Sequence, residues 1–167
     1  MSRAVLALGA NLGDRTAALQ GAVDALAPEA KVVGVSAIFE TAPVGGPEQP
    51  DYYNAVAIVE TGLSPSALLD LAHTIEADAG RVRLERWGPR TLDVDIIAFD
   101  DVMSDDPVLT LPHPRAHERA FVLLPWSDVD PDAVVPGRGR VAELLDTVEV
   151  AGVRRLDAPT LRLPEVR

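Results

Sequence analysis

Apolar residues recur with two different periods along the first hundred positions of this chain. Four runs of strand length are rich in valine, isoleucine and alanine, which is typical of buried strands. They lie at 4–9, 31–39, 53–61 and 92–99. Between them, apolar residues spaced three and four apart predict helices over 15–27 and 65–79. The resulting order of strand, helix, strand, strand, helix, strand is that of the ferredoxin-like βαββαβ core.

This order predicts an α+β fold with a mainly antiparallel sheet, helices on one face and the active site on the other. Both helices carry clear boundary signals. Asp14 is a predicted N-cap and Pro28 ends the first helix, whereas Ser64 and Pro65 begin the second and Gly80 ends it.

Two loops and the last third of the chain complete the expected layout. Segment 40–51 holds three prolines and two glycines, which exclude regular structure, and long loops of this kind tend to be functional. The second loop is 81–91. The last third of the chain adds a short helix near 141–148, and we expect its last dozen residues to be loosely held. We expect one domain over 1–167, with a core at about 4–136 and a C-terminal helix and tail at 137–167.

Composition and charge narrow the class of protein. The 167 residues include no cysteine, which excludes disulfides, thiolate metal sites and a cysteine nucleophile. No apolar run is long enough to span a membrane, and the first residues lack a signal-peptide layout, so we expect a soluble cytoplasmic protein. The formal net charge of -11 excludes a generic binder of nucleic acid or anionic membranes.

One segment departs from this acidic average. Arg81, Arg83, Arg86 and Arg90 fall within ten residues that contain a single acid, Glu85. The planar guanidinium group binds phosphate or carboxylate in a bidentate way. By itself, the cluster is equally well explained as a solvated loop.

The strand that follows the arginines carries two carboxylates. Asp93 and Asp95 should project from the same face, with Cα atoms roughly 6–7 Å apart, because side chains alternate along a strand. We expect Ile97 and Phe99 to continue this face. The opposite, helix-packed face should hold Leu92, Val94, Ile96 and Ala98.

Two carboxylates this close repel each other unless a cation lies between them. Oxygen ligands suit Mg²⁺, which keeps several waters and substrate phosphates, so the pair beside the arginines predicts a polyphosphate site. The alternative is that the two acids pair with Arg86 or Arg90 and only stabilise the loop.

The stretch 85–96, ERWGPRTLDVDI, resembles the signature of the 6-hydroxymethyl-7,8-dihydropterin pyrophosphokinases of folate biosynthesis. The resemblance covers about residues 4–136. Its other parts are LGANLG at 8–13, TAP at 41–43, QPDYYNAV at 49–56, GRVR at 80–83 and LPHP at 111–114.

The resemblance implies transfer of the β,γ-diphosphate of ATP to the hydroxymethyl oxygen of the pterin, which releases AMP. It implies two Mg²⁺ ions, held by Asp93 and Asp95, which would act in catalysis with Arg81 and Arg90. The residues it implies around ATP are Glu76, Arg81, Arg83, Arg90, Ile96, Thr110, His113 and Arg119. Those around the pterin are Thr41, Ala42, Val44, Tyr52, Asn54, Trp87 and Phe121.

The residue types agree with a pterin. A flat ring with an amide edge needs aromatic faces and a side chain that both donates and accepts, as Asn54 does. Aromatic residues make up only 4% of the chain, yet Tyr52 and Trp87 fall in the motif segments and Phe121 lies within the span of the resemblance. For a lone aromatic residue, packing in the core is the better explanation.

Two other functions stay open at this point. One is a metal-dependent phosphohydrolase that uses the same two acids, and the other is a non-catalytic, ferredoxin-like nucleotide-binding module. The expected partners are small molecules, ATP and the pterin, bound by a monomer, with no nucleic acid and no membrane.

Overall fold

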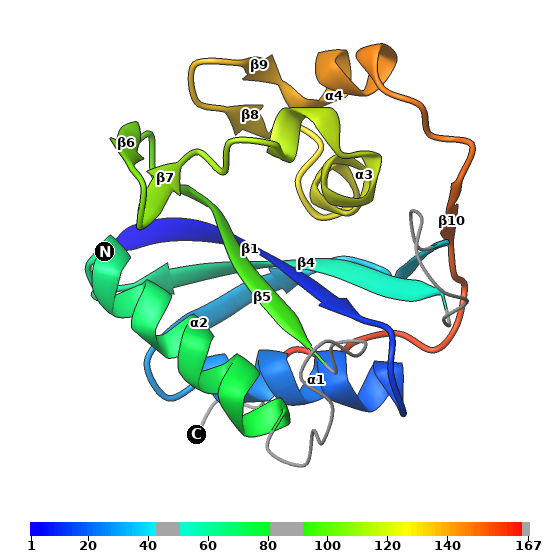
Figure 1. Cartoon of the computed structure of the whole chain (residues 1–167), viewed down its shortest axis with the longest axis horizontal. Helices are drawn as coiled ribbons and strands as arrows, with labels where there is room; N and C mark the ends of the chain where they lie inside the picture. Colours follow the sequence, from blue (N-terminus) through cyan, green and yellow to red (C-terminus); the bar gives the residue numbers. More distant parts are fainter. Residues whose placement is uncertain (43–50, 81–91, 165–167) are drawn as a thin grey trace.

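The computed structural model describes residues 1–42, 51–80 and 92–164 (Figure 1). Its main sheet has the strand order β10-β3-β4-β1-β5, with β2 also paired to β4. The strands are β1 (Ser2–Ala10), β2 (Lys31–Val35), β3 (Phe39–Thr41), β4 (Tyr52–Thr61), β5 (Asp93–Phe99) and β10 (Val153–Arg155).

The central strand β1 pairs antiparallel with both β4 and β5, and every other pairing in this sheet is antiparallel as well. Helix α1 (Arg15–Leu26) follows β1, and α2 (Pro65–Ala79) lies between β4 and β5. The predicted ferredoxin-like α+β core is therefore confirmed.

Both predicted helix starts are confirmed. The Asp14 carboxylate accepts a hydrogen bond from the Ala17 amide at 3.0 Å, and the Ser64 hydroxyl accepts one from the Ala67 amide at 3.1 Å. Each bond satisfies an amide that has no partner inside the helix. Helix α1 ends at Leu26, before Pro28, and α2 ends at Ala79, with Gly80 as its C-cap.

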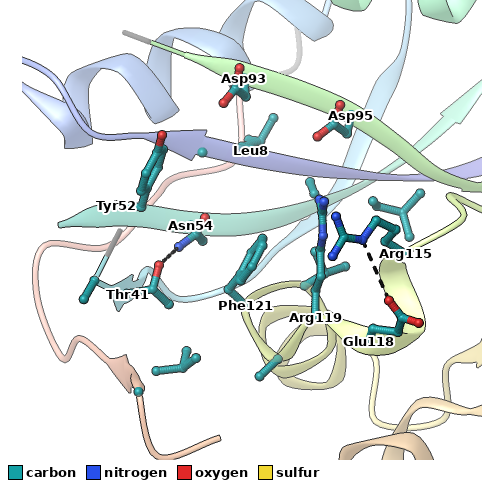
Figure 2. Close-up of a pocket in the computed structure, with 18 of the residues that line it drawn as sticks. Leu8, Thr41, Tyr52, Asn54, Asp93, Asp95, Arg115, Glu118, Arg119 and Phe121 are labelled. Carbon is teal, nitrogen blue, oxygen red and sulfur yellow. Dashed lines mark hydrogen bonds and ion pairs between the residues drawn. The ribbon is translucent and has the colours of Figure 1, made fainter. Parts of the chain in front are cut away.

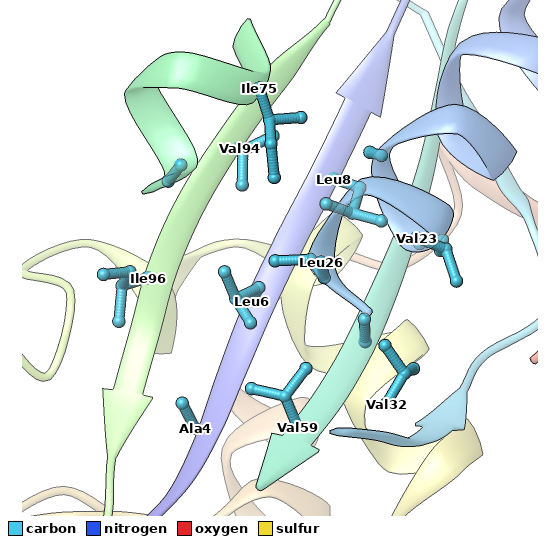
Figure 3. Packing of buried hydrophobic residues seen from close by; sticks show 14 of the residues in the cluster. Ala4, Leu6, Leu8, Val23, Leu26, Val32, Val59, Ile75, Val94 and Ile96 are labelled. Carbon is cyan, nitrogen blue, oxygen red and sulfur yellow. The ribbon is translucent and has the colours of Figure 1, made fainter. Parts of the chain in front are cut away.

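The first hydrophobic cluster lies between the sheet and these two helices (Figure 3). Leu6 and Leu8 of β1 pack with Leu26 of α1 and Ile75 of α2, and the two strand leucines are at most 1% exposed. Burying each such leucine contributes about 2 kcal/mol. Packed side chains therefore fill the space between the sheet and these helices.

The prediction of one strand over 31–39 is wrong, because the chain leaves the ladder at Ser36. The Ser36 amide donates to the Val56 carbonyl at 2.9 Å, and its hydroxyl accepts from the Val56 amide at 2.9 Å. The side chain thus takes the place of a backbone carbonyl in the pairing. As a result, β2 ends at Val35 and β3 begins at Phe39.

A β-bulge corrects the expected pattern of β5. Val5 pairs with Ala98 but Leu6 pairs with Ile96, which leaves Ile97 as an extra residue. Beyond the bulge the alternation reverses, so that Ala98 joins Ile97 on the second face and Phe99 joins the cluster under the helices. The expected faces of Ala98 and Phe99 are therefore wrong, whereas those of Leu92, Val94, Ile96 and Ile97 are confirmed.

The segment after β5 covers part of the second face. Helix α3 (Ala120–Val129) packs on β4 through Val122, Leu123 and Trp126, which are at most 3% exposed. The helix α4 (Val141–Leu144) and the 3₁₀ turn Leu145–Thr147 confirm the helix predicted near 141–148. The remaining elements are β6 (Ser104–Asp106), β7 (Leu109–Leu111), the 3₁₀ turn Ala116–Glu118, β8 (Val134–Val135) and β9 (Gly139–Arg140).

The last described residues are held tightly, which corrects the expectation of a loose end. Strand β10 pairs with β3 at the edge of the sheet. Leu161 is then buried in the first cluster, and Arg162 exchanges two backbone hydrogen bonds with the Gln20 side chain on α1. Among the described residues, no helix is long and apolar enough to cross a membrane.

Candidate functional site

A cavity of about 680 Å³ lies on the part of the second face that α3 leaves open (Figure 2). Its floor comes from β1, β3, β4, β5 and β10, and its opposite wall comes from the segment 115–122, which includes the start of α3. Because side chains from five strands and a helix meet here, the cavity exists only in the folded chain.

Asp93 and Asp95 both line this cavity, as the alternation along the strand predicted. They lie opposite Gly9 and Ala7 of β1, respectively. A Cβ atom on Gly9 would come 3.3 Å from the Asn54 Oδ1 atom, so the glycine lets the amide and the acids share one open floor. Asp93 is half-buried, whereas Asp95 is exposed, so the Asp95 carboxylate is accessible to solutes.

The described residues that we assigned to the pterin lie together at the other end of the floor. Thr41, Ala42, Tyr52, Asn54 and Phe121 all line the cavity. Asn54 is 7% exposed, and its Nδ2 atom donates to the Thr41 hydroxyl at 2.9 Å (Figure 2). Val44 and Trp87, the two other predicted pterin residues, lie outside the described residues.

Arg15, which the sequence patterns do not single out, holds the start of β4. Its Nη1 atom donates to the Asp51 carbonyl at 2.7 Å, and its guanidinium carbon lies 3.9 Å from the centre of the Tyr53 ring. A cation–π contact and a charge-assisted hydrogen bond from one side chain fix the backbone on both sides of Tyr52. Tyr52 and Asn54 are thereby held in place at the cavity.

The predicted nucleotide residues divide into two groups. Arg119 lines the cavity, with its guanidinium carbon 5.6 Å from the centre of the Phe121 ring. Glu76 and His113 instead bind the backbone of β5, where the Glu76 Oε2 atom accepts from the Val94 amide and the His113 amide donates to the Ile97 carbonyl, each at 2.9 Å.

Two further predicted nucleotide residues also lie off the cavity. Ile96 is 4% exposed in the cluster under the helices, so its side chain is part of the core. Thr110 lies on β7, which packs against β5, and its hydroxyl donates to the Asp106 carbonyl at 3.0 Å. The structure thus places Glu76, Ile96, Thr110 and His113 on or beside β5 rather than in the cavity.

His113 lies close to Asp95 in a half-buried position. Burial lowers the pKa of His113, the nearby Arg119 and Arg115 cations lower it further, and Asp95 opposes them. The Nδ1 atom accepts from the Arg115 amide at 3.2 Å, so the neutral ring carries its proton on Nε2. The imidazole can therefore donate a hydrogen bond to a phosphate or ribose oxygen at neutral pH.

Glu76 is a carboxylate whose surroundings oppose its charge. Burial raises its pKa above the usual value, and the charges of Asp93 and Asp95 raise it further, against the hydrogen bond from the Val94 amide. Three carboxylates therefore share one negative field. Adding a cation beside Asp93 and Asp95 would relieve this repulsion.

This field predicts that Glu76→Gln stabilises the chain in the absence of divalent cations. Because the pKa of Glu76 is higher in the folded chain than in the unfolded chain, the protonated carboxyl stabilises the fold at a pH below the unfolded-state pKa. This stability is lost as the pH rises through the folded-state pKa. The variant should therefore melt at a higher temperature than the wild type at pH 8, and the difference should vanish near pH 4. Thermal melts in a chelator across this range measure it.

The control for this prediction is Glu143→Gln, which removes an exposed carboxylate on α4. It should leave the melting temperature nearly unchanged at every pH. A Glu76→Gln variant that melts below the wild type at pH 8 would contradict the prediction.

The cavity also includes residues that the sequence patterns missed. Arg115 and Glu118 face it from the segment before α3, where they form an exposed ion pair at 3.8 Å. Their place beside the predicted Arg119 was the available signal. Glu149, Gly152 and Val153 line it from the C-terminal segment, and nothing in their local sequence indicated this.

The charge of the described lining fits a bound cation. Four carboxylates and two guanidinium groups line the cavity, which gives its described lining a formal charge of -2. Among the described residues, no three metal-ligating side chains gather into one group. Two carboxylates, with waters and phosphates as further ligands, are nevertheless a donor set that suits Mg²⁺. The predicted phosphate ligands Arg81, Arg83 and Arg90 lie outside the described residues.

Comparisons with known proteins identify the family of this chain. The family model described as 7,8-dihydro-6-hydroxymethylpterin-pyrophosphokinase (HPPK) matches residues 5–131. Two curated relatives carry the name 2-amino-4-hydroxy-6-hydroxymethyldihydropteridine pyrophosphokinase. The one from Methylorubrum extorquens is 43% identical over 94% of this chain and 100% of its own length. The one from Mycobacterium leprae is 47% identical over 98% of this chain and 93% of its own length.

Among solved structures, the chain is similar in fold to the Plasmodium falciparum HPPK-DHPS. One such structure, of the wild type with SDX-DHP, superposes with a TM-score of 0.69 at 15% identity and covers 87% of this chain. The match spans 44% of that longer chain, so it concerns the fold of one part. With the family match over 5–131 and these relatives over nearly the whole length, the chain belongs to the 7,8-dihydro-6-hydroxymethylpterin-pyrophosphokinase family.

Proposed function

We propose that this protein transfers the β,γ-diphosphate of ATP to the hydroxymethyl oxygen of 6-hydroxymethyl-7,8-dihydropterin in folate biosynthesis, which releases AMP. One observation carries the proposal: the carboxylates of Asp93 and Asp95 open into the same cavity as the Asn54–Thr41 pair. A group suited to phosphates and a group suited to a pterin thus lie on one floor.

The pterin half supports stacking and edge recognition. Tyr52 comes from the sheet and Phe121 from α3, so the two rings approach the cavity from opposite walls (Figure 2). A flat heterocycle between them would gain aromatic contact on both faces. The Asn54 amide, held by Thr41, would then read the donors and acceptors of the ring edge.

The acids would hold the metal. Asp93 and Asp95 would bind two Mg²⁺ ions, which supply charge neutralisation for the triphosphate and orientation of the reacting oxygen atoms. The chain's own part is to hold both carboxylates on one rigid, buried strand. Positioning and charge neutralisation account for most catalysis of phosphoryl transfer, so this rigidity is the main requirement.

The nucleotide would bind across the cavity and along β5. Arg119 faces the cavity, and the Nε2–H group of His113 offers a neutral donor beside Asp95. We include Glu76, Ile96 and Thr110 as neighbours of the nucleotide because the family resemblance implies them. Arg81, Arg83 and Arg90 would bind its phosphates, with Arg81 and Arg90 acting on the transition state.

Asn54→Ala tests the pterin half. The substitution removes both the donor and the acceptor that would meet the ring edge, and a buried hydrogen bond of this kind is worth about 1–3 kcal/mol. We expect the KM for the pterin to rise by about tenfold to a hundredfold while the KM for ATP stays constant. Steady-state kinetics with each substrate varied in turn measure the two values.

Asn54 is buried, so the same variant needs a measurement of folding. A thermal melt and a titration with a nonhydrolysable ATP analogue show whether the nucleotide half is intact. Equal losses in pterin and nucleotide binding would contradict the assignment of Asn54 to the pterin.

A single assay tests the function. AMP is measured after ATP and Mg²⁺ are added with and without the hydroxymethyl pterin, and again with a chelator. The proposal requires AMP that depends on both the pterin and the metal. Release of inorganic phosphate without pterin would indicate a phosphohydrolase, and nucleotide binding without turnover would indicate a binding module.

The proposal also includes the setting of the enzyme. We infer a single-domain monomer that acts on small molecules in the cytoplasm. Gel filtration with light scattering measures the oligomeric state.

A further inference from the structure

The cavity extends past the residues assigned to the pterin. Its last lining residues are Glu149, Gly152 and Val153, at β10 and in the turn before it. All three lie beyond the match to the family model, which ends at residue 131. This part of the wall therefore lies outside the residues that the family model matches.

The register of the sheet places one of these side chains on the cavity face. Val153 pairs with Thr41, and Thr41 pairs with Tyr52. Directly paired residues of an antiparallel sheet project from the same face, with Cα atoms about 5 Å apart. Val153 therefore lies one strand beyond Thr41, on the face that Thr41 and Tyr52 present to the cavity.

Contacts on both sides hold this strand in place. Arg154 forms an ion pair with Glu40 of β3, and the Arg155 Nε atom lies 3.3 Å from an Asp128 carboxylate oxygen on α3. The Leu156 amide then donates to the Ile38 carbonyl at 2.8 Å. Val153 is thus part of a fixed wall that joins the sheet to α3.

The chemistry of the substrate gives this wall a role, which rests on the proposed function. The hydroxymethyl arm would have to point to Asp93 and Asp95. The opposite end of the ring would then point across Asn54 and Thr41, which lie on the other side of the cavity floor (Figure 2), in the direction of β10. That end carries the exocyclic amino group. Val153 and Glu149 line the cavity there, so the valine side chain would limit the room beyond the amino group and the carboxylate would favour a donor.

We propose that the segment 149–153 is the end wall of the pterin subsite and that Val153 determines which pterins fit. The wall would admit an unsubstituted amino group and exclude pterins that carry a larger group there. Specificity would then come from a C-terminal strand in addition to the motif residues.

Val153→Phe tests the wall by filling it. We expect the KM for the pterin to rise at least about tenfold, with the KM for ATP unchanged, because added bulk in an apolar subsite discriminates at this level. The matched control is Val150→Phe in the same turn, where Val150 is 39% exposed and does not line the cavity. The control should keep both values, and thermal melts of both variants report on folding.

Val153→Ala tests the wall in the opposite direction. The substrate is 6-hydroxymethyl-7,8-dihydropterin methylated on its exocyclic amino nitrogen. The measured quantity is the kcat/KM for the methylated pterin divided by that for the parent pterin. We expect this ratio to be at least about fivefold higher in Val153→Ala than in the wild type, which is less than the discrimination that one methylene group can give. This arm decides the matter if the phenylalanine variant does not fold.

The outcomes are distinct. Wild-type AMP release that depends on the pterin establishes the function before any variant is compared. An unchanged KM for the pterin in a folded Val153→Phe variant, or an unchanged substrate ratio in Val153→Ala, would overturn the end wall and leave the function intact.

Discussion

Replacing Asp95 by alanine should lower kcat by about a hundredfold to a thousandfold, with little loss of pterin affinity. The substitution removes a carboxylate that would hold Mg²⁺ at the reacting phosphates, and removal of one such electrostatic contact costs this much in other enzymes. Asp93→Ala should have an effect of the same order. Coupled AMP release at saturating ATP and pterin measures kcat, and direct pterin titration measures affinity.

Stability separates this effect from damage to the fold. Asp95 contributes to the field that raises the pKa of Glu76, so its removal relieves repulsion in the metal-free chain. The melting temperature in a chelator should stay constant or rise while activity falls. Asp101→Ala, an exposed acid just after β5 and outside the cavity lining, serves as the matched control with normal turnover. Near-normal kcat in both Asp93→Ala and Asp95→Ala would remove the metal assignment.

Leu123→Ala should cost about 3 kcal/mol of unfolding free energy. Leu123 is 0% exposed in the second cluster, and buried leucine-to-alanine changes typically cost 2–5 kcal/mol through lost burial and the cavity left behind. At about 2–4 °C for each kcal/mol, the melting temperature should fall by roughly 6–12 °C. Chemical denaturation and calorimetry measure both quantities.

The same change should reach the active site through α3. Phe121 lies two residues before Leu123 on α3, and Arg119 is the residue directly before the helix. Both line the cavity, so a loosened α3 moves one of its walls. We expect activity to be lost at a lower temperature than in the wild type, in step with unfolding. Leu163→Ala, which truncates a leucine that is 51% exposed, should change the melting temperature little. A similar loss in both variants would contradict the role of the second cluster.

Local sequence signals predicted the parts of the site that lie within one element. Asp93 and Asp95 needed only the two-residue repeat of a strand to be placed on one face. Likewise, the caps at Asp14 and Ser64 required only a side chain and an amide three residues on. In each case the deciding interaction spans a few residues, so the local pattern contains it.

The errors share a different cause. The bulge at Ile97 is visible only in the pairing of β5 with β1, and the break at Ser36 depends on Val56, twenty residues away. The assignment of Glu76 and His113 to the nucleotide stays a prediction, but their bonds to the backbone of β5 come from the packing of α2 and of the segment after β7, and no local pattern indicated them. Interactions between segments that are distant in the sequence cannot be read from the residue pattern of either segment alone.

The sequence by itself determined the order of the core helices and strands apart from the division of 31–39 into two strands, the pair of acids and, through its motifs, the family. These properties follow from residue types at fixed spacing along the chain, and this spacing does not depend on how the elements pack. Only the tertiary structure decided that α3 covers part of the second face and that Val153 of β10 lines the cavity. Both depend on which surfaces bury the most apolar area and satisfy the edge of the sheet, a balance set by the whole chain at once.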